Sequence, residues 1–239
     1  MTATRLLTRL AATALAVGAV TLSVPAQAGV AAKPKGLDVS SHQGNVNWNS
    51  VRSKGASFVY VKATEGVSYR NPNYTQQYSG SYQAGLIRGA YHFALPNKSG
   101  GRQQADYFVS NGGGWSADGK TLPPALDMEY NPYGSTCYGL GKAALTNWIR
   151  AFSNRVRERT GRTPTIYTSA TWWNQCVGST GFGDHPLWIP RYAGSVGPLP
   201  VGWKRHTIWQ YNDHGTFPGD QNEFNGTLTD LRNLAKVKK

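Results

Sequence analysis

Residues 122–130 read Leu-Pro-Pro-Ala-Leu-Asp-Met-Glu-Tyr, a short apolar run with a proline start that ends in two carboxylates. Such a run is typical of a buried strand. If Ala125–Tyr130 is that strand, Asp127 and Glu129 lie on one face, because side chains two residues apart point the same way. A solvated strand end would show the same spacing, so these residues alone leave both interpretations open.

Working outward from this stretch, short β-rich runs alternate with helical patterns. The expected strands are Gly36–Ser40, Phe58–Ala63, Gly89–Ala94, Ala125–Tyr130, Thr165–Ser169, Leu187–Tyr192 and Thr207–Asn212. The expected helices are Trp48–Lys54, Tyr74–Ala84, Arg102–Ser110 and Leu140–Arg159. This alternation predicts an α/β fold, a single-domain parallel β/α barrel. After Thr171 the helical patterns fade, so we expect an incomplete or irregular (modified TIM) barrel. Tyr74, Tyr78 and Tyr82 have helical spacing and are expected in the core.

The first 28 residues have the features of a signal peptide. Arg5 and Arg9 precede an uncharged run from Leu10 to Val24, and Ala26-Gln-Ala28 fits a cleavage site. The run is short for a membrane span and has no basic stop-transfer cluster behind it. We therefore expect a secreted, extracellular protein with a leader over residues 1–28, one domain over 29–239 and no stable membrane insertion.

The net charge indicates which binding partners to expect. The net charge is +13, and it falls to +11 if the leader leaves with its two arginines. Such a surface attracts polyanions, and for a secreted protein these include cell-wall polymers. No long basic block favours nucleic acid.

Cys137 and Cys176 are the two cysteines, and an even number in a secreted chain predicts one disulfide. No metal, no cofactor and a monomer are expected.

Reactive groups of a barrel gather at the carboxyl ends of its strands. The candidates there, together with the acid of the last polar segment, are Asp38, Tyr91, His92, Asp127, Glu129, Tyr130, Tyr192, Trp209, Gln210 and Asp220. Neighbouring carboxylates raise one another's pKa, which supplies the protonated acid that glycoside cleavage needs. The aromatic side chains could stack on sugars or simply pack at the barrel mouth. Glu65, in Lys62-Ala-Thr-Glu-Gly66, fits a structural ion-pair partner as well as a substrate contact.

Several segments together resemble glycoside hydrolase family 25, the Chalaropsis-type lysozymes. They are Leu37-Asp-Val-Ser40, Phe58-Val-Tyr-Val-Lys-Ala-Thr-Glu-Gly66, Arg88-Gly-Ala-Tyr-His-Phe-Ala94, Ala125-Leu-Asp-Met-Glu129, Trp209-Gln-Tyr211 and residues 220–226. Their order matches the family over nearly the whole chain after residue 28, and secreted streptomycete members look most similar. The resemblance implies an N-acetylmuramidase that cleaves the β-1,4 bond between N-acetylmuramic acid and N-acetylglucosamine in peptidoglycan.

The same resemblance assigns roles to the acids. Glu129 matches the general acid and Asp127 the partner carboxylate, while Asp38 and Asp220 match two further acids that line the groove. Tyr91 matches a position near the substrate acetamido group. Asp127 could attack C1 directly or orient the substrate's own N-acetyl group, and we favour the second route because two carboxylates on one strand face do not straddle the sugar.

Two residues depart from the family pattern, and other functions on the same scaffold stay open. His42 stands where many family members have an aromatic residue, and Arg191 ends an expected strand, so subsite preference is open. A chitinase-like barrel would need an acid at Ala125. A glucosaminidase, or a wall-binding protein without catalysis on the same scaffold, is the other alternative.

Overall fold

The computed structural model describes residues 1–2 and 32–236, and the fold occupies residues 32–236. Eight strands close into a barrel, because β1 pairs with β9 on one side and with β2 on the other. The barrel strands are β1 (Lys35–Val39), β2 (Phe58–Glu65), β4 (Ile87–Phe93), β5 (Ala125–Asp127), β6 (Thr165–Tyr167), β7 (Leu187–Pro190), β8 (Ile208–Asn212) and β9 (Asp220–Phe224). A short strand, β3 (Tyr69–Arg70), extends β2.

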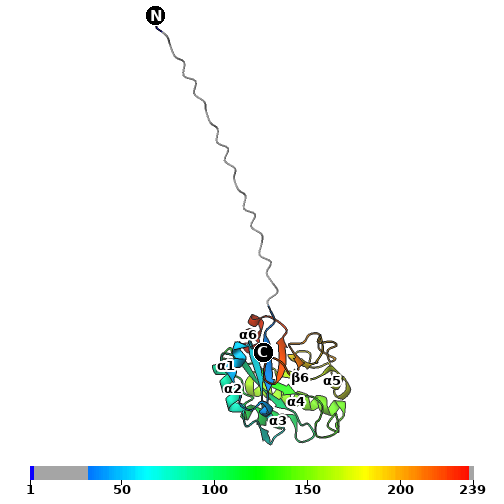
Figure 1. Cartoon of the computed structure of the whole chain (residues 1–239). Coiled ribbons are helices and arrows are strands. Elements are labelled where there is room, and N and C mark those ends of the chain that lie inside the picture. The colour runs from blue at the N-terminus through cyan, green and yellow to red at the C-terminus, as the bar shows by residue number, and fades with distance from the viewer. Residues whose placement is uncertain (3–31, 237–239) are drawn as a thin grey trace. The chain divides into compact units, whose positions relative to one another are not determined.

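Helices surround the barrel. They are α1 (Trp48–Ser53), α2 (Tyr74–Gln83), α3 (Gly101–Ser110), α4 (Lys142–Thr160), α5 (Ala170–Cys176) and α6 (Leu228–Lys236), with a 3-10 turn η1 at Ser41–Gln43. Figure 1 shows α1 and α2 on one side of the barrel, α5 on the opposite side, and α3 and α4 between them. The predicted α/β barrel is confirmed.

The barrel is irregular in its second half, as predicted. Seven strands run parallel, but β9 is antiparallel to both β8 and β1. Within residues 32–236, no helix separates β7 from β8 or β8 from β9. Long loops therefore replace helices there, and the last strand reverses direction to close the barrel.

Three buried clusters hold these layers together. Inside the barrel, Tyr60 stacks on Trp188 with ring centroids 4.9 Å apart, and Tyr167 meets Trp188 edge-on at 4.8 Å. A second cluster joins the outer face of β4–β7 to α3, α4 and α5, and a third joins β1 and β2 to α1 and α2. Because β-strand side chains alternate, each strand contributes one face to the interior and one to the helices.

Helix α4 follows its sequence pattern closely. The predicted apolar stripe of Leu145, Trp148, Ile149, Phe152 and Val156 is buried against the barrel. Gly161 ends the helix with φ of 70°, a left-handed conformation that glycine adopts at little cost.

Some elements differ from the sequence prediction. Helix α5 was not expected, yet the Ser169 side chain caps it by accepting a hydrogen bond from the Trp172 backbone N–H (3.1 Å). Helix α6 and strand β9 were also missed. Tyr82 is not in the core: it is 40% exposed, with the Arg88 guanidinium 4.3 Å from its ring centroid.

The predicted disulfide is present. Cys137, in the loop after β5, is bonded to Cys176 at the end of α5. This bond ties the loop that follows Glu129 to the outer helix layer. The predicted leader, residues 1–28, falls almost entirely outside the described residues. Among the described helices, none has the length and apolar character that crossing a membrane requires.

Candidate active site

The four predicted acids meet at one end of the barrel. Asp38 lies near the carboxyl end of β1, paired in register with Asp220 at the start of the antiparallel β9. Asp127 is the last residue of β5, and Glu129 follows it by two. Ala125 belongs to the interior cluster while Leu126 and Met128 belong to the outer one. The alternation therefore turns both Asp127 and Glu129 inward, as predicted.

Strand β5 is shorter than the predicted Ala125–Tyr130. It ends at Asp127, although the Met128 backbone N–H still donates to the Tyr167 carbonyl oxygen at 2.9 Å. Glu129 thus lies just beyond the end of the strand, and its side chain still points into the barrel.

Gln210 on β8 links two of the acids. Its Nε2 donates to Asp38 Oδ2 at 2.9 Å and to Asp220 Oδ2 at 3.0 Å. Its Oε1 accepts hydrogen bonds from the hydroxyls of Tyr167 (2.9 Å) and Tyr192 (3.1 Å). Gln210 is only 2% exposed. Its amide donors thus hold the two acids, and the two tyrosine hydroxyls fix its oxygen, so the amide positions the acids.

Asn222 on β9 gives Asp38 a second support. Its Nδ2 donates to Asp38 Oδ2 at 2.7 Å, and its own Oδ1 accepts from Trp188 Nε1 at 2.7 Å. These donors favour the ionised form of Asp38, yet they do not outweigh burial. Burial, followed by the charge of Asp220, raises the pKa of Asp38 to about 8.

The other acids are shifted in the same direction. Burial raises the pKa of Glu129 to about 7, against an opposing effect of the Lys62 charge. Burial raises the pKa of Asp220 to about 6, with a contribution from Asp213. Burial and the Glu129 charge raise the pKa of Asp127 well above its ordinary value. The cluster therefore retains protons at a pH where exposed carboxyls have lost them.

Lys62 on β2 is the cation whose charge opposes the pKa shifts of Asp127 and Glu129. Its Nζ forms an ion pair with Glu65 Oε2 at 2.6 Å, and Glu65 Oε1 accepts from the Tyr133 hydroxyl at 2.6 Å. Of the two roles open for Glu65, the geometry supports the structural ion pair. Tyr133, which the sequence did not single out, is 66% exposed in the loop before the disulfide.

The chain was compared with known proteins. The family model described as glycosyl hydrolases family 25 matches residues 37–220. The chain belongs to this family. It is therefore a glycoside hydrolase, as the sequence resemblance predicted.

Similar proteins agree with this assignment. The chain is 48% identical to "Lysozyme M1" of Streptomyces globisporus over 84% of this chain and 71% of that protein. It is 45% identical to "N,O-diacetylmuramidase" of Chalaropsis sp over 84% and 98%, respectively. Among solved structures, the muramidase of Acremonium alcalophilum has a TM-score of 0.83 at 51% identity, covering 85% of this chain and 99% of that one.

Aromatic side chains surround the acids of this family 25 site. Tyr91 on β4 points into the barrel and meets Trp188 edge-on, with ring centroids 6.1 Å apart. Tyr130 and Tyr192 are 45% and 52% exposed. Trp209 is half-buried and packs against the outer cluster, and its Nε1 donates to the Arg191 carbonyl oxygen at 2.8 Å. Exposed rings beside buried acids provide stacking surfaces for sugars.

His92 does not join the site, which corrects its prediction as a substrate contact. The residue is fully buried on the outer face of β4, next to Phe108 and Phe152. Its Nδ1 accepts from Thr64 Oγ1 (2.8 Å) and its Nε2 donates to Gln104 Oε1 (2.9 Å). Burial lowers its pKa to about 4, so it is a neutral core histidine.

The two departures from the family pattern lie at the surface. His42 is an exposed residue of the 3-10 turn η1, and the Arg191 side chain is exposed after β7. Neither makes an ion pair within residues 32–236. The residues that sequence reasoning missed are the supports behind the acids: Tyr167, Trp188 and Asn222.

Proposed function

We propose that this protein is a secreted muramidase that hydrolyses the β-1,4 bond between N-acetylmuramic acid and N-acetylglucosamine in bacterial peptidoglycan. The observation that carries the proposal is the inward-facing pair of Asp127, which is buried, and Glu129, which is half-buried, close to Asp38 and Asp220 in a chain with few acids. The names of the relatives, lysozyme and muramidase, supply the substrate.

Glu129 is proposed as the general acid. With its pKa raised to about 7, it holds a proton at neutral and mildly acidic pH and can donate it to the glycosidic oxygen as the C1–O bond breaks. The resulting carboxylate then takes a proton from the water that attacks C1. The same residue thus acts first as acid and then as base.

Asp127 is proposed to orient the substrate's N-acetyl group. Its Oδ1 is buried and has no hydrogen-bond partner among the described residues, so it can accept the amide N–H of the sugar. The acetamido oxygen would then attack C1 and form a cyclic intermediate, which water opens with retention of the anomeric configuration. Tyr91, whose side chain lies inside the barrel, is proposed to contact the same acetamido group.

The remaining predicted residues complete the site. Asp38 and Asp220 line the groove, held by Gln210, while the exposed rings of Tyr130 and Tyr192 and the half-buried ring of Trp209 are proposed to contact flanking sugars. Residues 1–28 are proposed to act as a cleaved leader, which would place the enzyme outside the cell, where its substrate is.

The central test is Glu129→Gln on purified peptidoglycan. We expect a loss of turnover by at least about a thousandfold, because the amide cannot protonate the leaving oxygen, while binding to intact walls persists. Reducing-end analysis of wild-type products should find N-acetylmuramic acid. Reducing ends of N-acetylglucosamine would instead identify a glucosaminidase, and unchanged turnover in Glu129→Gln would remove the acid assignment.

Product stereochemistry tests the second half of the mechanism. On a defined muroglycan, nuclear magnetic resonance of the first products should show the β-anomer. Net inversion would rule out the route through the acetamido group.

A further inference from the structure

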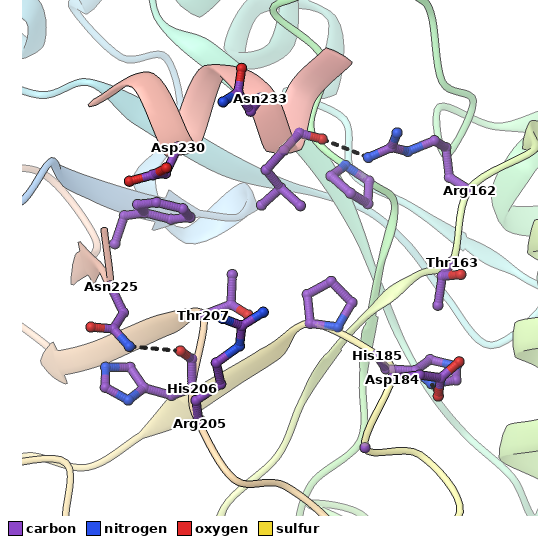
Figure 2. A pocket seen from close by; sticks show the side chains of 15 residues that line it. Arg162, Thr163, Asp184, His185, Arg205, His206, Thr207, Asn225, Asp230 and Asn233 are labelled. Atoms are coloured by element: carbon purple, nitrogen blue, oxygen red, sulfur yellow. Dashed lines mark hydrogen bonds and ion pairs between the residues drawn. The ribbon is translucent and has the colours of Figure 1, made fainter. Parts of the chain in front are cut away.

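A cavity of about 620 Å³ lies at the barrel end opposite the acids. Its walls come from residues that precede parallel strands, such as Pro123 before β5, Thr163 before β6 and Thr207 before β8, and from residues of α6. Figure 2 shows Asp230 and Asn233 on α6 at one side, Arg205 and His206 across from them, and Arg162 with Thr163 at a third edge. The cavity is large enough for a small ligand.

Arg162 in this wall is a buried cation without an acidic partner. Two cationic residues are buried within residues 32–236, Arg88 (8% exposed) and Arg162 (3% exposed). Arg88 forms an ion pair with Asp118 at 2.9 Å. Arg162 forms none: its Nη2 donates to the Leu234 carbonyl oxygen at 2.6 Å, while its Nε and Nη1 have no hydrogen-bond partner in the described part of the chain.

An unpaired buried charge is costly, and proteins normally compensate it with a counter-ion. The ring of Trp115 lies 4.8 Å from the Arg162 guanidinium carbon, which offsets only part of that cost. Arg162 therefore differs from Arg88 in having no acidic side-chain partner among the described residues.

The other charged residues of the cavity do not pair with Arg162. Asp184 is bonded to His185 Nδ1 (2.8 Å) and lies 3.5 Å from Arg157 Nη2. Asp230 accepts from the backbone N–H and the hydroxyl of Thr227 at 2.8 and 2.6 Å. Both acids are thus engaged, while the Arg205 side chain is exposed at the rim and forms no ion pair in residues 32–236.

We propose that this cavity binds the phosphate of a polyol phosphate or sugar phosphate, between Arg162 in the wall and Arg205 at the rim. A phosphate has oxygens in several directions, so it can meet two arginines from different sides. The neutral polar groups suit the attached hydroxyls: Asn225, Asn233, Thr163 and His185, whose Nε2 has no hydrogen-bond partner among the described residues. Burial lowers the pKa of His185, so the neutral ring can accept a hydrogen bond from a ligand hydroxyl at Nε2.

Such a site would hold the enzyme on a phosphate-bearing wall polymer while the acidic end reaches the glycan. The inference does not rest on the proposed hydrolytic role, because the residues at the two ends are different. Failure of one proposal therefore leaves the other testable.

The experiment is calorimetric titration of the full chain with glycerol 3-phosphate, inorganic phosphate and glycerol at matched ionic strength. We expect saturable one-to-one binding of glycerol 3-phosphate, weaker binding of phosphate and none of glycerol. Arg162→Gln and Arg205→Gln should each weaken binding at least about tenfold, because each removes a charge-assisted hydrogen bond. A poly(glycerol phosphate) arm identifies the source: tighter binding than the monomer indicates a wall polymer, and equal binding a free polyol phosphate.

Arg232→Gln is the matched control. Arg232 is exposed on α6 but does not line the cavity, so this variant should bind like the wild type. Arg205→Gln lies at the surface and keeps the test valid if Arg162→Gln does not fold, and its turnover of a soluble muropeptide should equal that of the wild type. Absence of saturable binding, equal weakening by Arg232→Gln, or wild-type affinity in Arg205→Gln would overturn the proposal.

Discussion

The two ends of the barrel shift the pKa of an aspartate in opposite directions. At the carboxyl end, Asp38 is buried among other acids, and burial together with Asp220 raises its pKa to about 8. At the amino end, burial also acts on Asp118, but hydrogen bonds from Lys120 and the ion pair with Arg88 outweigh it, and its pKa falls to about 2. One residue type on one scaffold thus differs in pKa by several units.

The difference shows what each end contributes. At the amino end, paired charges such as Arg88 and Asp118 stabilise the fold, and Arg162 differs because it has no ion-pair partner among the described residues. The acids at the carboxyl end accept hydrogen bonds from amides but have few cations near them, so their ionised forms are destabilised. Such destabilisation is expected where protonation is needed for chemistry, because paired carboxylates would stay ionised and could not donate a proton.

The largest expected contrast between the ends is in catalysis. Asp127→Asn should lower kcat by at least about a hundredfold, because a neutral amide cannot stabilise the charge that develops on the acetamido group. Asp118→Asn, the matched change at the other end, should leave kcat within about twofold. Initial rates on a soluble muropeptide measure both. Retention of most activity in Asp127→Asn would mean that the partner role belongs to another acid.

A smaller effect is expected from the residue that joins the acids. Gln210→Met removes the amide between Asp38 and Asp220 and leaves the Tyr167 and Tyr192 hydroxyls without their acceptor. We expect kcat to fall about tenfold and its pH profile to shift, since Asp38 and Asp220 lose a donor that favours their ionised forms and their charges act on the pKa of Glu129.

The pH profile of Gln210→Met separates positioning from packing. A purely structural role would lower the melting temperature without moving the profile. An increase in KM with unchanged kcat would instead mean that Gln210 contacts the substrate, as first predicted from the sequence.

Much of the barrel could be predicted because its first half has long apolar runs. Strand β9 could not, since Asp220–Phe224 reads Asp-Gln-Asn-Glu-Phe and carries no apolar alternation. Its structure comes from tertiary pairing with β1 and β8, which no local pattern reports. Helix α5 was missed for a similar reason: it is short, and buried Trp172 and Trp173, not periodicity, hold it in place.

In the site, the sequence identified the acids but not their supports. Tyr91 and His92 are neighbours on β4, so alternation alone places one inside the barrel and the other outside. The sequence pattern predicts both as substrate contacts, although only one of two neighbouring strand residues can face the barrel interior. Asn222 was not predicted because its strand was not recognised, and Gln210 was predicted as a site residue without its hydrogen bonds to Asp38 and Asp220.

The smallest expected contrast is in stability, where the two ends should differ in sign. Asp38 has a folded-state pKa above its unfolded value, so its contribution to stability is present below about pH 4 and is lost as the pH rises through about 8. Asp118 has a depressed pKa, so its contribution is present above about pH 4 and is lost as the pH falls through about 2.

At pH 8, Asp38→Asn should therefore raise the melting temperature and Asp118→Asn should lower it. Shifts of a few degrees are expected, because about 1 kcal/mol moves the midpoint of a domain of this size by roughly 2–4 °C. Calorimetric melts at pH 5 and pH 8 measure both, and the gain from Asp38→Asn should shrink at pH 5, where the wild-type carboxyl is protonated. A loss of stability in Asp38→Asn at pH 8 would show that its bonds to Gln210 and Asn222 outweigh burial, and that the carboxyl end is stabilised in the same way as the amino end.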